Sequence, residues 1–492
     1  MRRPLEGSYW ATLAVVLLAL SPNIVVTTAY GLMTKTLVHH TGLDRTGLEV
    51  TEGLSNAGYA FGALVGGDLT QRFRQRYVFL VCESLFVVGC GFSAVSWGAV
   101  SFASGRVLQG LATGLLLTAA IPPLVQLFGP ERLSATAAWI NVGFFGAVTI
   151  GPLAGGAATL GTGHWRWLFG GLGLLGLAGL GLALVALPVR EPPNPDLPPD
   201  WAAFALAGVG TVAPFVAVSL LVSRTFASPG FVGLLSAGTV ALVTLLAVEY
   251  RKEEPLSPVE PMSTSLPVLG ILVASLGGAV YVTLLQLTEL YLQQVAHESS
   301  VSAGLAVWPQ VVTLVVAALA FYVLVRRRSA HIAAFVLAGL VLLAAAGGLL
   351  TRLGTWSPRP VVLGASALLG LGAGATVSPA LWLAGWSTPV KLVGRVFALV
   401  ELLRAEADYV MGPILQRIAH VSSAGIGLGH GIEHALWLTL LIALATIALC
   451  VAVYLGSGLG PEPPDLELYL EEGEPGLDSP PFLARLRSPA AW

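Results

Sequence analysis

Four charged residues lie within eight positions of a mostly apolar stretch, residues 393–419. They are Glu401, Arg404, Glu406 and Asp408. On a helix, Glu401, Arg404 and Asp408 share one face because residues three, four and seven positions apart lie above one another. Glu406 lies about 140° around the helix from Glu401. One arginine cannot neutralise three carboxylates in a low-dielectric environment, so at least one acid should bind a proton or a cation near neutral pH. Alternatively, the helix is short or displaced and the charges line a wet mouth.

A second polar face falls within the apolar stretch 265–294. Gln286, Glu289 and Gln293 are spaced i, i+3 and i+7 along it, so a helix would present them together. A lone glutamate in an apolar membrane helix is a functional candidate by default, although water reaching the helix end would also account for it. We therefore add Glu289 to the candidates for proton coupling or substrate binding and expect the two glutamines to line a cavity.

An arginine lies deep in the apolar stretch 99–128. Placing Arg106 in a membrane costs about 2.5–3.5 kcal/mol, so it should face a cavity or a partner. We count it with the proton-coupling or substrate-binding candidates, and we expect Gln109, one turn further on, and Asn23, in the first apolar stretch, to line the cavity. Weaker candidates, expected near an interface, are Glu52, Asn56 and Glu83.

The composition sets the class of protein that must position these groups. Of 492 residues, 55% are hydrophobic and only 11% are charged, against about 25% charged residues in soluble domains. A soluble enzyme, a disulfide-rich secreted scaffold and a nucleic-acid binder are therefore excluded. The three cysteines lie in apolar stretches without metal-ligand spacing, and no lysine follows a glycine as in a phosphate-binding loop. We expect no metal site, no cofactor and no enzymatic activity.

Apolar runs long enough to cross a bilayer recur along the chain and predict an all-α polytopic membrane protein. Fourteen membrane-spanning helices are expected, at 10–33, 49–70, 77–97, 99–128, 134–160, 165–188, 201–222, 229–249, 265–294, 300–325, 331–351, 360–384, 393–419 and 432–456. If the N-terminus is cytoplasmic, sixteen Lys and Arg, with Arg2 and Arg3 among them, lie on the cytoplasmic side and seven on the outer side. This asymmetry predicts an inner-membrane protein with both termini in the cytoplasm.

Three segments carry glycine-rich or basic motifs. The stretch 99–128 contains Gly105, Arg106, Gln109 and Gly110 in the pattern RxxQG. Residues 151–156 read GPLAGG, with Gly151, Pro152, Gly155 and Gly156, and the short loop after residue 70 carries Gln71, Arg72 and Arg76. Glycines permit close helix approach, the proline removes a helical hydrogen bond, and the basic residues can pair with helix ends.

These motifs together resemble the major facilitator superfamily, in particular its 14-helix drug:proton antiporter branch. The segment Trp165–Phe169 and the stretch from Leu290 to Pro309 are also similar to that branch. The resemblance implies two six-helix bundles, 10–188 and 265–456, separated by an inserted helix pair within 189–264. It also implies a central cavity and alternating access. Residues 1–9 would form a cytoplasmic N-terminus and residues 457–492 an acidic, proline-rich cytoplasmic tail, to which we assign no chemistry.

The sequence departs from the family pattern at two places. In the segment after residue 70, Gln71 stands where the family has an aspartate and Arg74 where it has a glycine. In the first helix the branch has an acid, whereas this chain has Ser21-Pro22-Asn23. If that acid carries protons in relatives, this chain must couple elsewhere or not at all.

Three functional hypotheses remain open at this stage. The first is a monomeric exporter that exchanges a hydrophobic or cationic small molecule for protons by alternating access. The second is a lipid or lipid-precursor transporter of the same fold, with weak or no proton coupling. The third is a polytopic acyltransferase-like enzyme using His40 and Asp44, whose HxxxD spacing arises often by chance. Small-molecule substrate, protons and membrane lipids are the expected partners.

Overall fold

The computed structural model describes residues 4–252, 255–457, 462–480 and 482. Arg2 and Arg3, which contributed to the predicted charge asymmetry, and the tail arginines Arg485 and Arg487 lie outside the described residues. Within the described part of the chain, helices are the only regular secondary structure. The prediction of an all-α fold is confirmed.

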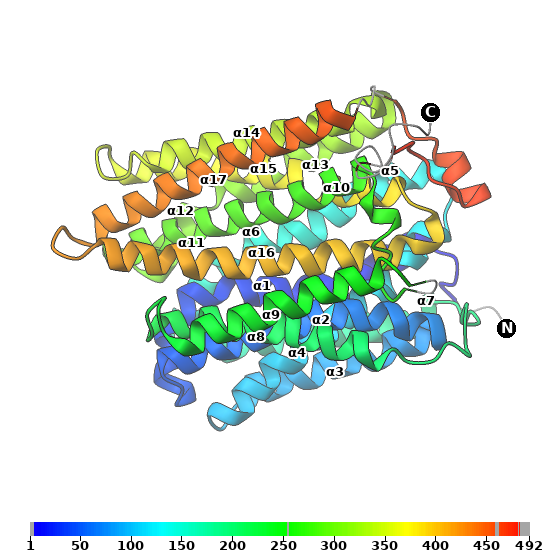
Figure 1. The fold of residues 1–492 in the computed structure, drawn as a ribbon. Helices are drawn as coiled ribbons and strands as arrows, with labels where there is room; N and C mark the ends of the chain where they lie inside the picture. The colour runs from blue at the N-terminus through cyan, green and yellow to red at the C-terminus, as the bar shows by residue number, and fades with distance from the viewer. Residues whose placement is uncertain (1–3, 253–254, 458–461, 481, 483–492) are drawn as a thin grey trace.

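The helices run lengthwise through the molecule (Figure 1). Their bounds are α1 (Tyr9–Thr41), α2 (Arg45–Arg72), α3 (Gln75–Val95), α4 (Ala99–Gln126), α5 (Pro130–Ile140), α6 (Gly146–Ala158), α7 (His164–Ala186), α8 (Trp201–Ser219), α9 (Pro229–Glu249), α10 (Ser265–Leu272), α11 (Gly278–Gln294), α12 (Ser300–Ala306), α13 (Pro309–Arg327), α14 (Ile332–Leu350), α15 (Pro358–Trp386), α16 (Val393–Ser422) and α17 (Leu428–Ser457).

Two predicted spans are continuous helical rods with an internal change of winding. The π-helical turn η1 (Asn141–Phe145) joins α5 to α6, and the π-helical turn η4 (Val273–Gly277) joins α10 to α11. The first helix is longer than predicted, because Ser8 caps its start and it continues without a break to Thr41.

Twelve helical segments in the described residues are long and apolar enough to cross a membrane, so the chain is a multi-pass membrane protein. Helices α2 and α16 are equally long but are not among the twelve. Both carry several charged residues, and hydropathy alone does not assign them to the bilayer. The count of fourteen spans therefore stays a prediction.

Small residues let helices within the first part of the chain approach closely. Helix α4 packs on α2 and α3, and α1 packs on α6 and α7. A Cβ atom on Gly110 would overlap the main chain of Ser55, and one on Gly105 would lie 2.7 Å from the carbonyl oxygen of Gly89. The glycines of the RxxQG segment thus sit where backbones nearly touch.

The later helices pack among themselves and also against the earlier ones. Helix α15 contacts α13 and α14, and α16 contacts α11 and α17. Helix α16 also contacts α2 and α4, while α12 contacts α6. Helices α8 and α9 form a hairpin, and α8 packs against both α2 and α16.

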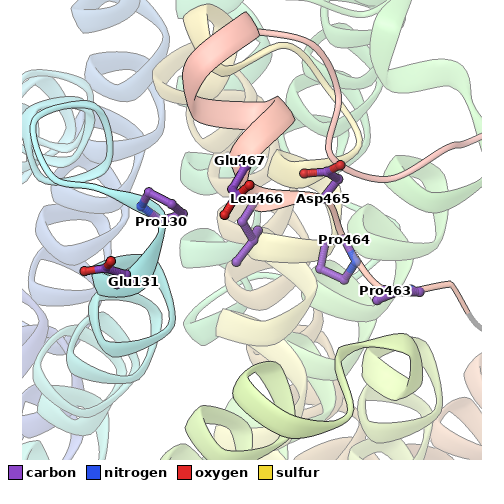
Figure 2. A pocket seen from close by; sticks show the side chains of 7 residues that line it. All are labelled: Pro130, Glu131, Pro463, Pro464, Asp465, Leu466 and Glu467. Carbon is purple, nitrogen blue, oxygen red and sulfur yellow. The ribbon is translucent and has the colours of Figure 1, made fainter.

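The described part of the tail, residues 462–480, packs against the helix ends. It includes a short helical turn, η7 (Leu468–Glu472), whose Tyr469 is fully buried. The Leu477 amide donates to the Trp386 carbonyl (3.0 Å) and the Ser265 amide to the Pro480 carbonyl (3.1 Å). A surface hollow of about 550 Å³ lies between residues 463–467 and the start of α5, as Figure 2 shows.

Candidate functional site

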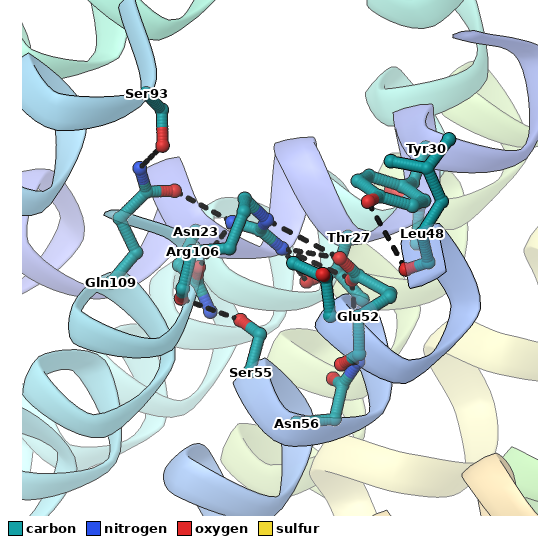
Figure 3. Close-up of polar contacts among 12 residues, drawn as sticks. Asn23, Thr27, Tyr30, Leu48, Glu52, Ser55, Asn56, Ser93, Arg106 and Gln109 are labelled. Atoms are coloured by element: carbon teal, nitrogen blue, oxygen red, sulfur yellow. Dashed lines mark hydrogen bonds and ion pairs between the residues drawn. The ribbon is translucent and has the colours of Figure 1, made fainter. Parts of the chain in front are cut away.

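Arg106 is fully buried and lies in a polar network formed by α1, α2, α3 and α4 (Figure 3). Its guanidinium donates to both carboxylate oxygens of Glu52, with Nη2 lying 3.0 Å from Oε1 and 2.8 Å from Oε2. Nη1 donates to Gln109 Oε1 (2.6 Å) and Asn23 Oδ1 (3.3 Å). The Arg106 cation therefore has a partner, as its membrane cost requires, and the partner is a residue of α2.

Glu52 supplies this part of the molecule with the carboxylate that the first helix lacks. Its side chain is 5% exposed, and Asn56 Nδ2 donates to its Oε1 (3.3 Å). Gln109 extends the network to α3, because its Nε2 donates a hydrogen bond to Ser93 Oγ at 2.9 Å. Asn23, expected to line a cavity, is buried and serves as an acceptor for Arg106.

The charges of α16 form a second buried cluster. Arg404 lies between two acids: its Nε and Nη2 donate to Glu401 Oε2 (2.9 and 2.6 Å), and its Nη1 donates to Asp408 Oδ2. Glu401 is completely buried and Asp408 is 7% exposed. These exposures do not fit the alternative in which the charges line a wet mouth.

Three carboxylate oxygens of α16 have no hydrogen-bond partner in the described part of the chain. They are Glu401 Oε1, Glu406 Oε1 and Asp408 Oδ1. Glu406 is 8% exposed and forms no ion pair there. The cluster therefore has three carboxyl groups and one guanidinium, with Glu406 standing apart from Arg404.

The three polar side chains on one face of α11 contact three different helices: α16, α12 and α1. Gln286 Oε1 accepts from Gln416 Nε2 of α16 (2.9 Å), and Gln293 Nε2 donates to Ser300 Oγ (3.4 Å). Glu289 points at α1, because its Oε2 lies 3.1 Å from where a Cβ atom on Gly31 would stand. Glu289 is 7% exposed, and its Oε1 has no hydrogen-bond partner among the described residues.

A tyrosine joins the α16 cluster to α2. Tyr59 Oη donates to Glu401 Oε2 at 2.8 Å, and Tyr59 is 5% exposed. The sequence reasoning missed this residue. A signal was present, because Glu52, Ser55 and Tyr59 follow at i, i+3 and i+7 and so share one face of α2.

The Gly-Pro segment of α6 lies where two other helices approach. A Cβ atom on Gly155 would overlap the main chain of Ala29 in α1. One on Gly156 would lie 2.7 Å from the Ser300 carbonyl oxygen in α12. Gly151 contacts α1 at Thr28, and the Pro152 carbonyl oxygen faces Gly304 of α12.

The residues expected in a loop after residue 70 lie in helices instead: Gln71 and Arg72 end α2, and Arg76 stands in the first turn of α3. The two arginines bind helix ends and a neighbouring acid. Arg76 donates to the carbonyl oxygens of Leu184 (2.8 Å) and Leu187 (3.3 Å) at the end of α7. Arg72 pairs with Asp68, and the Gln71 main-chain oxygen accepts from the Asn194 amide (2.9 Å). These contacts fix the loop between α2 and α3 against the end of α7.

The two residues of the acyltransferase hypothesis, His40 and Asp44, form hydrogen bonds to the main chain at helix ends. His40 Nδ1 lies 2.8 Å from the Thr36 carbonyl oxygen within α1. Asp44 caps α2, where its Oδ1 accepts from the Gly47 amide at 2.8 Å. This arrangement accounts for both side chains by local helix geometry.

Ionisable side chains buried between long apolar helices are typical of substrate and ion pathways in membrane proteins. Residues 15–407 match the family model described as Major Facilitator Superfamily, and the chain belongs to this family. Proteins of this family are transporters that carry small molecules.

Two curated relatives show the level of similarity. The chain is 32% identical over 276 residues to the uncharacterized MFS-type transporter YubD of Bacillus subtilis, covering 55% of this chain and 53% of the relative. It is 27% identical over 327 residues to a multidrug resistance protein B homolog of Mycobacterium tuberculosis, covering 64% and 58%. The matches span roughly half the length of these curated relatives.

Solved structures share the fold at low sequence identity. The human organic anion transporter MFSD10 superposes with a TM-score of 0.64 at 18% identity, covering 90% of this chain and 99% of that one. The peptide transporter POT in complex with sulfate gives 0.62 at 16% identity, covering 90% and 94%. At these identities the likeness establishes the fold alone.

Proposed function

We propose that this transporter exports hydrophobic or cationic small molecules in exchange for protons. The observation that carries the proposal is the α16 cluster, in which Arg404 pairs with the buried carboxylates of Glu401 and Asp408 while the buried Glu406 carboxyl stands apart from it. The name of the Mycobacterium relative, a multidrug resistance protein B homolog, supports the substrate class. Glu406 and Asp408 are the proposed proton or cation acceptors, with Glu401 and Glu289 as further acceptors and Arg404 and Arg106 tuning them.

Charge compensation gives the exchange its physical basis. Arg404 offsets one negative charge, so two of the three α16 acids need another positive charge when they are ionised away from water. A proton on the carboxyl or a cationic substrate beside it meets that need, and one displaces the other. An inward-moving proton gains about 2.3 kcal/mol per 100 mV of membrane potential, plus the pH term.

Alternating access would move helices 10–188 against helices 265–456, with the hairpin of α8 and α9 between them. Contacts between these two groups occur at both ends of the molecule. At one end, Gln126 Nε2 donates to the Val390 carbonyl oxygen (3.4 Å). At the other, α6 meets α12 at Gly156 and Ser300. Rocking would break one set of contacts while keeping the other.

The proposal includes a location and an assembly state. We place the chain in the inner membrane with both termini cytoplasmic, on the strength of the Lys and Arg distribution, and we propose separately that it acts as a monomer. The tail and the start of α1 lie at the same end of the molecule (Figure 1), which supports an even number of crossings.

The proposal is tested with protein in liposomes that contain a pH dye. A gradient of a lipophilic cation, or of a lysolipid, is imposed without a proton gradient. Proton movement that follows one cation, and that is lost in the double variant Glu406→Gln/Asp408→Asn, is the expected result. The matched control is Glu474→Gln/Asp478→Asn, which makes the same chemical changes at exposed positions of the tail.

Two results would contradict the proposal. Proton-coupled transport that persists in Glu406→Gln/Asp408→Asn would remove α16 as the proton carrier. Movement of a lysolipid without proton movement would instead support a lipid transporter of the same fold. That second candidate is favoured by the neutral Asn23 in α1 and by the compensated charge of Arg106.

A further inference from the structure

Two tyrosines cross the contact between α2 and α16, which belong to the two helix groups proposed to move. Tyr59 of α2 donates to Glu401 Oε2 of α16 at 2.8 Å. Tyr409 of α16 donates to the Glu49 main-chain oxygen of α2 at 3.1 Å. We call the contact between α2 and α16 that these two hydrogen bonds span the α2–α16 seam.

The two acceptors respond differently to protons. The main-chain oxygen that accepts from Tyr409 has no titratable proton, so its hydrogen bond does not depend on pH through the acceptor. Glu401 is ionisable, and a hydrogen bond to a carboxylate is roughly twice as strong as one to a neutral group. Only the Tyr59 bond can therefore change strength when the cluster changes charge.

One oxygen of Glu401 performs two tasks. Oε2 accepts from Nε and Nη2 of Arg404 and also from Tyr59, whereas Oε1 has no hydrogen-bond partner among the described residues. The atom that neutralises Arg404 is therefore the atom that ties α16 to α2. A proton or a cation that enters this cluster competes for that same oxygen.

Tyr59 also stands on the face of α2 that carries the Arg106 network. Glu52, Ser55 and Tyr59 share that face, and Ser55 Oγ donates to the Arg106 main-chain oxygen at 2.8 Å. Because α2 moves as one helix, displacement at Tyr59 shifts the Arg106–Glu52 pair as well. The two buried charge clusters thus meet through α2.

We propose that Tyr59 is a positioning residue that couples the charge of the α16 cluster to the α2–α16 seam: its hydroxyl holds α2 against an ionised Glu401 and releases it when the cluster takes up a proton. This inference rests on the proposed function, because it assigns to the same cluster the contact through which proton uptake moves a helix.

Other ionisable groups near α16 have separate partners or positions. Helices α8 and α10 and the turn η4 contain none. Helix α15 contains Arg359, and α17 contains His430, Glu433, His434, Cys450 and Tyr454. On α4 and α2, Arg106 pairs with Glu52 and Arg72 with Asp68. Glu289 of α11 faces Gly31. In the described part of the chain, the groups that hydrogen-bond to Glu401 are Tyr59 and Arg404.

The test measures the seam directly and needs no substrate. Spin labels replace Phe73, 54% exposed, and Lys391, also exposed, at the ends of the two helices, in a background without Cys82, Cys90 and Cys450. Double electron–electron resonance in lipid nanodiscs then gives the distance between the labels from pH 5 to 9. We expect the distance to lengthen as the pH falls.

Tyr59→Phe keeps the ring and removes only the hydroxyl, so packing is preserved. Loss of a hydrogen bond that favours the ionised carboxylate should move the midpoint of the distance change to higher pH by about one to two pH units. Tyr409→Phe removes a hydroxyl from the same seam and should leave the midpoint unchanged. In a Glu401→Gln background, Tyr59→Phe should have no effect on the midpoint.

Three results would overturn the inference. They are a distance that does not change with pH in the unaltered chain, a Tyr59→Phe midpoint equal to that of the unaltered chain, and an equal midpoint shift in Tyr409→Phe. The proposed function fails separately, in liposomes, if no substrate gradient moves protons. If the label distance across the seam changes with pH but no substrate gradient moves protons, this inference stands and the proposed export mechanism fails.

Discussion

Replacing Glu52 by glutamine should strongly destabilise the protein, because it leaves Arg106 buried without a counter-ion. The guanidinium makes three hydrogen bonds to the Glu52 carboxylate, from Nε at 3.2 Å and from Nη2 at 3.0 and 2.8 Å. Glutamine keeps one acceptor oxygen and places an NH₂ group against the cation. Removing one partner of a buried ion pair costs about 3–5 kcal/mol.

The assay is thermal unfolding in detergent, followed by the loss of the monodisperse peak on size-exclusion chromatography. Glu52→Gln is compared with Arg106→Gln and with the double variant, in which no charge is left unpaired. We expect the double variant to be more stable than the sum of the two single changes by about 2 kcal/mol or more.

The matched control is Glu298→Gln, the same substitution in a solvent-accessible ion pair with Arg359 at 3.4 Å. Surface pairs of this kind contribute about 0–1 kcal/mol, so its melting temperature should change little. Equal losses in Glu52→Gln and Glu298→Gln, or additive effects in the double variant, would refute the reasoning.

Two further predictions concern packing and pH. Gly110→Ala should abolish the folded peak because its Cβ atom would overlap the Ser55 main chain, whereas Gly91→Ala, which meets nothing within 4 Å, should melt like the unaltered chain. Burial raises the pKa of Asp200, but the hydrogen bonds from Lys252 and from the Ala203 amide, together with the Lys252 charge, outweigh this and hold the pKa below its ordinary value of 3.8. A depressed acid stabilises above its unfolded pKa and loses that stability as the pH falls through the folded value. The decrease in melting temperature caused by Asp200→Asn at pH 7 should therefore shrink as the pH falls below about 3.8 and vanish below the folded pKa; a decrease that stays constant as the pH falls would contradict the assignment.

Much of the helical architecture could be predicted because the bilayer imposes a length and an apolar composition on each span. The expected stretch 229–249 coincides with α9, and 265–294 coincides with the rod formed by α10, η4 and α11. The first helix was placed too short, because its end carries the polar residues His39 and His40 and hydropathy does not extend that far. Family membership followed from the glycine and arginine motifs and is confirmed by the match over residues 15–407.

The tail illustrates a different limit. Leucines that alternate with Glu467 and Tyr469 between 466 and 470 are compatible with a disordered segment or a short surface helix. The structure has a helical turn there and buries Tyr469 completely. The tail packs against helix ends that are distant in sequence, such as those at Ser265 and Trp386. The local sequence pattern of the tail therefore could not predict these contacts.

By itself the sequence determined that Arg106 and the acids of α16 must find partners or protons, because an uncompensated charge in a low-dielectric interior is too costly to remain. Only the tertiary structure decided which partners these are. Glu52 reaches Arg106, and Tyr59 reaches Glu401 across 342 positions of the chain. The physical reason is that helix periodicity fixes which residues share a face, whereas the packing of one helix on another decides which faces meet.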